Sequence, residues 1–158
     1  MSVSIEVKLT GFETVMDALS RLSPLDTGTL LEGLARLIQQ QTRERIYTEK
    51  TAPDGTPWTA NNAGSSILLA DGTLARSIDY AVQGESAVVG SGLIYSRIHQ
   101  LGGTIKPKSK KNLAFQLGGK LILAMKVVMP ARPYLGISAD NASEILEAVA
   151  DFVRRKLG

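Results

Sequence analysis

The sequence predicts an α+β fold, in which long N-terminal helices and a C-terminal helix pack on a small antiparallel sheet. Apolar residues recur with helical spacing over residues 12–22, 26–47 and 140–157, which predicts three helices. Between the second and third of these, alternating apolar residues and glycine turns predict short antiparallel strands. The chain has 158 residues and no internal repeat, so we expect residues 1–158 to form a single domain.

A strand is expected at the start of the chain. Apolar and polar residues alternate over Val3 to Leu9, which is typical of a strand with one buried face. Ser23-Pro24 is expected to end the first helix, because the residue before a proline disfavours the helical conformation. Asp26 or Thr27 is the expected cap of the second helix, whose apolar stripe extends to about Tyr47.

Residues 48–72 are expected to form a long, mobile loop. They are rich in proline, glycine and asparagine, and loops of this length are often functional or mobile. The only tryptophan, Trp58, lies within the loop. It is either an anchor packed on the core or a contact for a partner. We favour the anchor, because burying so large a ring is worth a few kcal/mol.

A short helix and a β-hairpin are expected after the loop. Residues 73–78 form the predicted helix, with Asp71 as its cap. Residues 79–83 and 87–89 form the predicted hairpin around Gly84-Glu85.

A second helix and a second hairpin follow. Residues 93–101 predict a helix that ends at Gly102-Gly103. Residues 113–117 predict a strand that turns back through Gly118-Gly119, a frequent two-residue hairpin turn, into a strand over 120–129.

The stretch Pro130-Ala131-Arg132-Pro133 is expected to end this strand, because proline has no N–H to donate to a neighbouring strand. Arg132 stands on a stiff backbone between two prolines. It is expected to tie carbonyl groups of neighbouring strands, to pair with a carboxylate such as Asp79, or simply to be part of a rigid exit toward the last helix. Asn141 and Glu144 have the spacing of a capping box for that helix.

The charges are unevenly distributed. Residues 1–100 carry eight Lys or Arg and eleven Asp or Glu, whereas residues 101–158 carry ten and four. No acidic residue occurs over 86–139. This region is expected to present a positive field to an acidic partner, or to be a hydrated basic loop without one. The candidate basic contact surface consists of Lys106, Lys108, Lys110, Lys111, Lys120 and Lys126.

The composition argues against most enzyme classes. The chain has no cysteine and one histidine, which argues against a zinc site and fits a reducing compartment or a virion. The sequence has no phosphate-binding loop and no serine in a nucleophile elbow. We therefore expect no cofactor and no catalysis. The N-terminus lacks the pattern of a signal peptide, and no apolar stretch approaches the ~20 residues of a membrane span.

The histidine, His99, lies in the predicted helix before Gly102. Catalysis requires a positioned partner group, and the sequence offers none, so we expect His99 to bond a backbone carbonyl or pack against Tyr95, four residues earlier. Its neighbour Gln100 can donate and accept at once, which suits a side chain that ties two backbone segments together.

Three stretches taken together, APDGTPW (52–58), GTLARSI through IYSRIHQLGG (72–103) and MPARPYLGIS (129–138), resemble the phage virion morphogenesis family of Mu-type tail completion or head–tail joining proteins. The resemblance covers about residues 10–155. The chain departs from the family pattern at Arg97, where a small residue is expected, and in the short lysine-rich stretch 106–112. The matching residues are Pro53, Gly55, Trp58, Leu74, Ser77, Ile78, Tyr95, His99, Gln100, Gly102, Pro130, Ala131, Arg132, Pro133, Leu135 and Gly136.

The resemblance implies a non-enzymatic structural protein of the virion, present in the host cytoplasm during assembly. Such a protein acts in tail completion and head–tail joining and forms a ring at the neck. The implied partners are other copies of the chain and tail tube, terminator or connector proteins, with weak DNA contact and no membrane. The loop 48–72 and the hairpin 113–129 are the expected contacts between subunits.

The residues leave two alternatives open. The first is a nucleic-acid-binding domain that uses the basic region 106–126. The second is a hydrolase that depends on His99.

Overall fold

The structure, a computed structural model, describes residues 3–7, 20–21, 23–109 and 111–158. The helix expected over 12–22 lies almost wholly outside these residues, as do Leu9 and Lys110. The elements in chain order are β1 (Val3–Val7), α2 (Pro24–Glu44), the π-helix η1 (Arg45–Glu49), α3 (Thr73–Arg76), β2 (Ile78–Gln83), β3 (Ser86–Ser91), α4 (Ser96–Leu101), β4 (Gly103–Ile105), β5 (Leu113–Leu117), β6 (Lys120–Ala124), β7 (Val127–Met129) and α5 (Ala139–Leu157).

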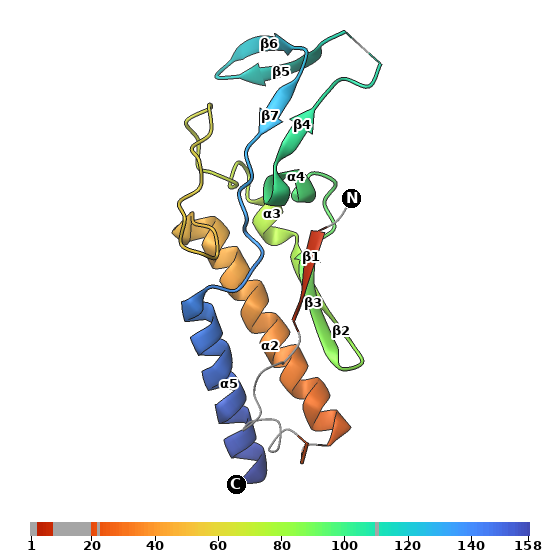
Figure 1. Ribbon diagram of the computed structural model, residues 1–158, viewed down its shortest axis with the longest axis vertical. Coiled ribbons are helices and arrows are strands. Elements are labelled where there is room, and N and C mark those ends of the chain that lie inside the picture. Colours follow the sequence, from red (N-terminus) through yellow and green to blue (C-terminus); the bar gives the residue numbers. More distant parts are fainter. Residues whose placement is uncertain (1–2, 8–19, 22, 110) are drawn as a thin grey trace.

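Helix α2 is the central element of the fold. It lies between helix α5 and an antiparallel sheet of strand order β1-β3-β2 (Figure 1). Strand β3 is the central strand of this sheet, and β1 and β2 pair with its two opposite edges, both antiparallel. The predicted α+β class, with a C-terminal helix and a small antiparallel sheet, is confirmed.

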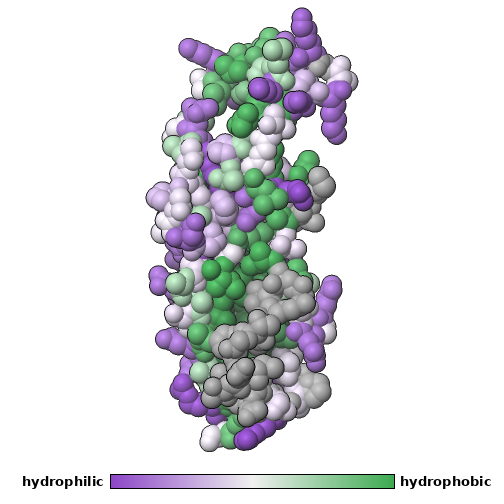
Figure 2. All heavy atoms as spheres, in the orientation of Figure 1, coloured by the Kyte–Doolittle hydropathy of each residue, from purple (hydrophilic) through white to green (hydrophobic). Residues whose placement is uncertain are grey.

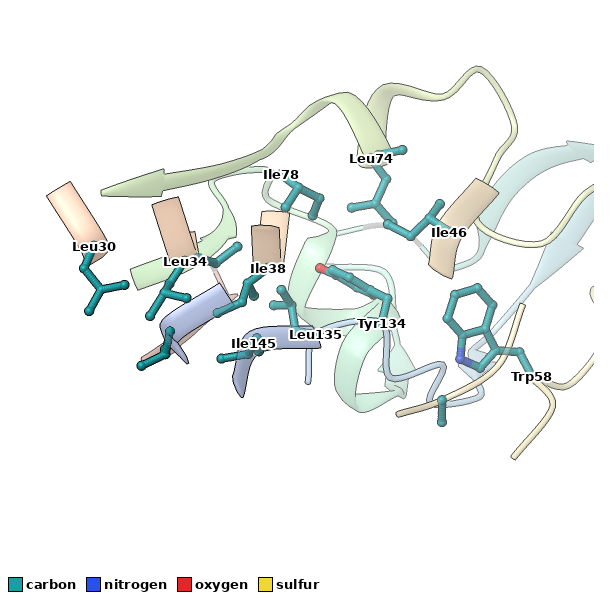
Figure 3. Close-up of a cluster of buried hydrophobic side chains, with 14 residues drawn as sticks. Leu30, Leu34, Ile38, Ile46, Trp58, Leu74, Ile78, Tyr134, Leu135 and Ile145 are labelled. Atoms are coloured by element: carbon teal, nitrogen blue, oxygen red, sulfur yellow. The ribbon is translucent and has the colours of Figure 1, made fainter. Parts of the chain in front are cut away.

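The core fills the space between these layers (Figure 3). Aliphatic side chains build most of it, and burying each is worth about 1.5–3 kcal/mol. The buried apolar residues that α2, the sheet and α5 contribute to the main cluster are Leu30, Leu34, Ile38, Ile78, Val89, Ile145 and Val149. Leu31, Ala35 and Ala87 form a second, smaller cluster.

The helix caps differ from the predicted ones. Ser23 is the N-cap of α2: its Oγ accepts from the backbone N–H of Asp26 (3.2 Å), and Pro24 occupies the first turn. Ser23-Pro24 therefore begins a helix, because the first turn is where proline loses no hydrogen bond. The cap of α5 is Ser138, which forms a reciprocal capping box with Asn141. The predicted capping box between Asn141 and Glu144 is therefore wrong.

Two short helices also have different bounds from those predicted. Gly72, at a φ of 75°, is the N-cap of α3, and Asp71 supports it by accepting from the N–H of Thr73 (2.9 Å). The helix ends at Arg76, and Ile78 already belongs to β2. Helix α4 begins only at Ser96.

Residues 103–129 form an arm that projects from one end of the molecule, beyond α4 (Figure 1). Strands β4 and β7 pair at its base, and strands β5 and β6 form a hairpin at its tip. The single strand expected over 120–129 is therefore wrong. The chain changes partner at Met125-Lys126, because the register of β5 with β6 ends at Ala124 and that of β4 with β7 begins at Val127.

Gly102 sets the direction in which the arm leaves α4. It has a φ of 69° and a ψ of −177°, a region that only glycine readily adopts. A Cβ on it would lie 2.7 Å from the backbone N of Ala131 and 2.9 Å from the carbonyl O of Met129. The close approach of these two backbones thus requires glycine.

Within the described residues, no helix combines the length and the apolar character needed to cross a membrane.

Candidate functional site

The segment 130–136 lies between β7 and α5, and several of the family-matching residues contact it. Gln100 of α4 binds it through three hydrogen bonds. Its Oε1 accepts from the N–H groups of Tyr134 (3.0 Å) and Leu135 (2.9 Å), and its Nε2 donates to the carbonyl of Leu135 (3.1 Å). One side chain thus pairs with a stretch of backbone that has no strand partner. The predicted tie between two backbone segments is present.

Replacing Gln100 with leucine is expected to lower the free energy of unfolding by about 2–4 kcal/mol, because two backbone N–H groups lose their acceptor. Urea denaturation followed by circular dichroism measures this change. Gln116→Leu, the same substitution at an exposed position of β5, is the control and is expected to change stability by less than about 0.5 kcal/mol. Equal effects at both positions would contradict the assignment.

Trp58 of the loop and Arg132 of the segment hydrogen-bond the loop to the same segment. Trp58 is 6% exposed, and its Nε1 donates to the carbonyl of Pro133 (2.9 Å). Arg132 donates from Nε to the carbonyl of Thr59 (2.8 Å) and from Nη2 to that of Ala60 (3.3 Å). Trp58 is therefore an intramolecular anchor. Arg132 ties carbonyl groups of the loop, and the alternatives of neighbouring strands and of an ion pair with Asp79 are wrong.

The stretch APDGTPW makes the tight turn that presents Trp58. Gly55, at a φ of 85°, donates to the carbonyl of Ala52 (2.9 Å), and Asp54 accepts from the N–H of Thr56 (2.9 Å). Pro53 lies so close to Gly136 that a Cβ on this glycine would run into the proline ring. The turn therefore packs directly on the end of the 130–136 segment.

Arg45 is a residue of this site that the sequence interpretation missed. Its side chain is fully buried, and it donates from Nη1 to the carbonyls of Tyr134 (3.0 Å) and Gly136 (2.9 Å) and from Nη2 to Oδ1 of Asn141 (2.5 Å). Burial lowers the pKa of Arg45, and Glu49, whose Oε2 lies 3.5 Å from Nε, opposes that shift. Arg45 thus joins η1, the 130–136 segment and the start of α5.

One sequence signal pointed to Arg45. It lies seven residues after Ile38 and eleven after Leu34, on the buried stripe of its helix. A charged residue at such a position requires internal hydrogen-bond partners, since burying it unpaired is very costly.

Tyr134 completes the connection to α4. Its ring is fully buried, and its hydroxyl donates to the carbonyl of Ser96 (3.1 Å). Burial raises the pKa of Tyr134 to about 12. The phenol therefore stays neutral and acts as a structural donor.

His99 packs edge-on against Tyr95, with ring centroids 5.8 Å apart. Its carbonyl accepts from the N–H of Arg132 (2.8 Å). Burial and the nearby Arg132 charge lower the pKa of His99, which keeps the ring neutral at pH 7. No residue in the described part of the chain bonds its buried Nδ1. Within the described residues, Nδ1 therefore has no partner that orients the ring, which a general base requires.

His99 lines a hollow of about 380 Å³ between the loop and the base of the arm, together with Leu68, Leu74, Met129 and Arg132. Among the described residues, no three of His, Cys, Asp and Glu lie together in a way that could hold a metal ion. The described residues that line the hollow therefore include no group that could hold a metal ion.

The arm gathers the basic residues into one region. Lys106, Lys108, Lys111, Lys120 and Lys126 are exposed there, and none forms an ion pair with another described residue. Figure 2 shows apolar side chains gathered over the tip of the arm, with hydrophilic side chains projecting around them. The arm is therefore both basic and apolar on its surface.

Comparison with known proteins identifies relatives of the chain. Residues 7–154 match the family described as the phage virion morphogenesis family. Over 84 residues the chain is 37% identical to a protein of Escherichia phage Mu named "Putative capsid assembly protein G", a match that covers 53% of this chain and 44% of that protein. The chain thus spans less than half the length of this relative. No solved structure matches the chain.

Proposed function

The chain belongs to the phage virion morphogenesis family, and on that premise we propose that it completes the phage tail and joins it to the head. The observation that carries the proposal is the family match, which extends over residues 7–154. In this proposal the protein is a non-enzymatic structural component of the virion, present in the host cytoplasm while particles assemble.

The arrangement of the molecule supports an assembly role. The loop, α4 and η1 are all hydrogen-bonded to the 130–136 segment, and Arg45 of η1 also binds Asn141 of α5, so the body offers a fixed platform. The arm extends from that platform and exposes apolar and basic side chains. A fixed body with an exposed arm suits contact with other proteins better than it suits turnover of a small molecule.

The proposed form in the virion is a ring at the neck, made of copies of this chain. Its proposed neighbours are the tail tube or terminator on one side and the connector on the other. Contact between two different surfaces of identical subunits produces a closed ring when the rotation between them allows closure.

Removal of this gene from the phage or prophage that carries it is expected to leave heads and tails unjoined. Electron microscopy of lysates measures the ratio of joined to separate particles, and added purified protein is expected to restore joining. Joined, infectious particles in the absence of the gene would contradict the proposal.

Light scattering of the purified protein, at raised concentration and with tail tubes, tests whether it forms a ring. A strict monomer under all of these conditions would exclude it.

The lysines of the arm favour a second candidate, a nucleic-acid-binding domain. That function predicts DNA binding whose affinity falls steeply with salt. The logarithm of the binding constant is expected to fall against the logarithm of the salt concentration with a slope of about −0.9 per phosphate contacted. Absence of DNA binding at low salt would remove this candidate.

A further inference from the structure

The hairpin at the tip of the arm is apolar on both faces. The cross-strand pair Phe115–Ile122 lies on one face, because residues directly opposite one another share a face. Leu121 and Leu123 alternate with Ile122 and lie on the other face. The four most exposed apolar side chains of the arm are between 62% and 73% exposed: Leu121, Leu123, Met125 and Val128.

Nothing in the described part of the chain covers these side chains. The core clusters, including the half-buried residues packed against them, contain no residue of the arm. A two-stranded hairpin alone is at best marginally stable in water. An apolar patch rimmed by polar side chains marks a surface for another protein. We therefore expect the exposed apolar side chains of the arm to be buried against another protein.

The charges of the arm restrict the partner. Its exposed lysines have no acidic residue among them, since none occurs over 86–139. A matching surface must be acidic and partly apolar. The phosphates of a nucleic acid would pair with the lysines but would leave the leucines exposed. The arm also contains a single aromatic residue, Phe115, on which a base could stack.

A surface with the required charge lies on this same chain. A groove of about 380 Å³ between the end of α2 and the start of α5 is lined by Glu44, Glu49, Asp140 and Glu144, and by no lysine or arginine. Arg45 is buried beside the groove, and its Nε lies 3.5 Å from Oε2 of Glu49. Arg45 therefore partly offsets the negative charge of one of these four carboxylates. Ile137, next to the groove-lining residue Ser138, is exposed and offers apolar contact.

A second feature of the groove indicates that its occupant carries a hydrogen-bond donor. Gln41 lines the groove and is only 6% exposed, and its Oε1 has no hydrogen-bond partner among the described residues. Its Nε2 already donates to Glu144 (2.6 Å). The carboxylates do not converge into a metal-binding group in the part of the chain that the structure covers. An ammonium group fits such a dispersed acidic surface better than a metal ion does.

We infer that the arm of one copy docks on the acidic groove of the next copy, with its lysines at the carboxylates and its leucines covered by the rim. The inference rests on the proposed assembly function and names the contact that builds the ring. The arm and the groove are different surfaces of the chain, so the contact is head-to-tail and repeats around a closed ring. The lysines set the orientation and the approach, and the apolar side chains provide most of the affinity.

Cross-linking tests the contact directly, because the chain has no cysteine of its own. One chain carries Lys126→Cys, and a second, mass-tagged chain carries Glu44→Cys. A short bismaleimide added to the mixture is expected to give a cross-linked heterodimer. The control replaces the second chain with Glu147→Cys, an exposed position of α5 that does not line the groove. The control mixture is expected to give no heterodimer.

Charge reversal tests the same contact without a linker. The arm variant Lys120→Glu with Lys126→Glu, and the groove variant Glu44→Lys with Asp140→Lys, are each expected to weaken self-association about tenfold or more, since like charges then meet. Combining all four changes in one chain is expected to restore self-association. Glu147→Lys, outside the groove, is expected to leave it unchanged, and circular dichroism checks that every variant is folded.

The possible outcomes separate this inference from the proposed function. Loss of association in both variants with rescue in the combined chain supports the arm–groove contact. Unchanged association in the arm variant, or heterodimers in the control as abundant as with Glu44→Cys, overturns it, while head–tail joining in lysates tests the function separately. An arm variant that loses DNA binding but keeps its self-association would make the arm a nucleic-acid surface and would also overturn the inference.

Discussion

Replacing Arg45 with methionine is expected to lower the free energy of unfolding by about 3–5 kcal/mol. The change removes the guanidinium donors from the carbonyls of Tyr134 and Gly136. It also leaves Oδ1 of Asn141 with only the N–H of Ser138 (3.4 Å) as a donor. Methionine fills much of the space of the arginine stem but donates no hydrogen bond. Lysine is not expected to rescue the protein, because a single ammonium group cannot reproduce the planar fork that reaches all three acceptors.

Urea denaturation followed by circular dichroism measures the effect of Arg45→Met. The matched control is Arg36→Met in α2, whose side chain is exposed and pairs with Glu32 at 2.6 Å. Exposed ion pairs contribute little to the free energy of unfolding, so the control substitution is expected to lower it by at most about 1 kcal/mol. A loss for Arg45→Met no larger than that of the control would show that the buried network adds nothing to stability beyond its packing.

Replacing Trp58 with alanine is expected to cost about 3–5 kcal/mol, because it opens a cavity in the core. The ring is nearly fully buried, and its Nε1 bond to Pro133 fastens the loop to the 130–136 segment. Trp58→Phe is expected to cost less, since it keeps most of the ring but loses the hydrogen bond, which is worth about 1 kcal/mol.

Circular dichroism in urea measures the stability of these Trp58 variants, and limited proteolysis reports on the loop. Cleavage within residues 48–72 is expected to be faster in Trp58→Ala than in wild type, because the anchor is lost. Tyr47→Ala, at a side chain that is 45% exposed, is the control. Equal stability and equal cleavage in Trp58→Ala and Tyr47→Ala would contradict the role of Trp58 as an anchor.

Local patterns in the sequence predicted most of the elements. The apolar stripe over 140–157 predicted α5 to within one residue of its observed start, and the turn at Gly118-Gly119 placed the hairpin of β5 and β6. These features depend on residues close together in the chain, which periodicity and turn chemistry describe well. The caps were less predictable, because Ser23 and Ser138 compete with several neighbouring residues that cap equally well.

The site was only partly predictable, for a different reason. Gln100 was recognised as a tie because its amide donates and accepts at once, and Trp58 was recognised as an anchor because burying so large a ring is favourable. The role of Arg45 depends on acceptors 89 to 96 residues away in the chain. No local pattern encodes such distant partners. The split of the strand expected over 120–129 was missed because it depends on which two strands lie opposite it.

The long sequence separation within the Arg45 network also bears on how the protein is made. A ribosome adds about 5–20 residues per second, so the guanidinium leaves it several seconds before the carbonyls of Tyr134 and Gly136 exist. Until then, Arg45 lacks its three acceptors and has only Glu49, four residues later, as a charged partner. We therefore expect this polypeptide to reach its native state only around the end of translation, and prematurely terminated chains to be degraded by cellular proteases.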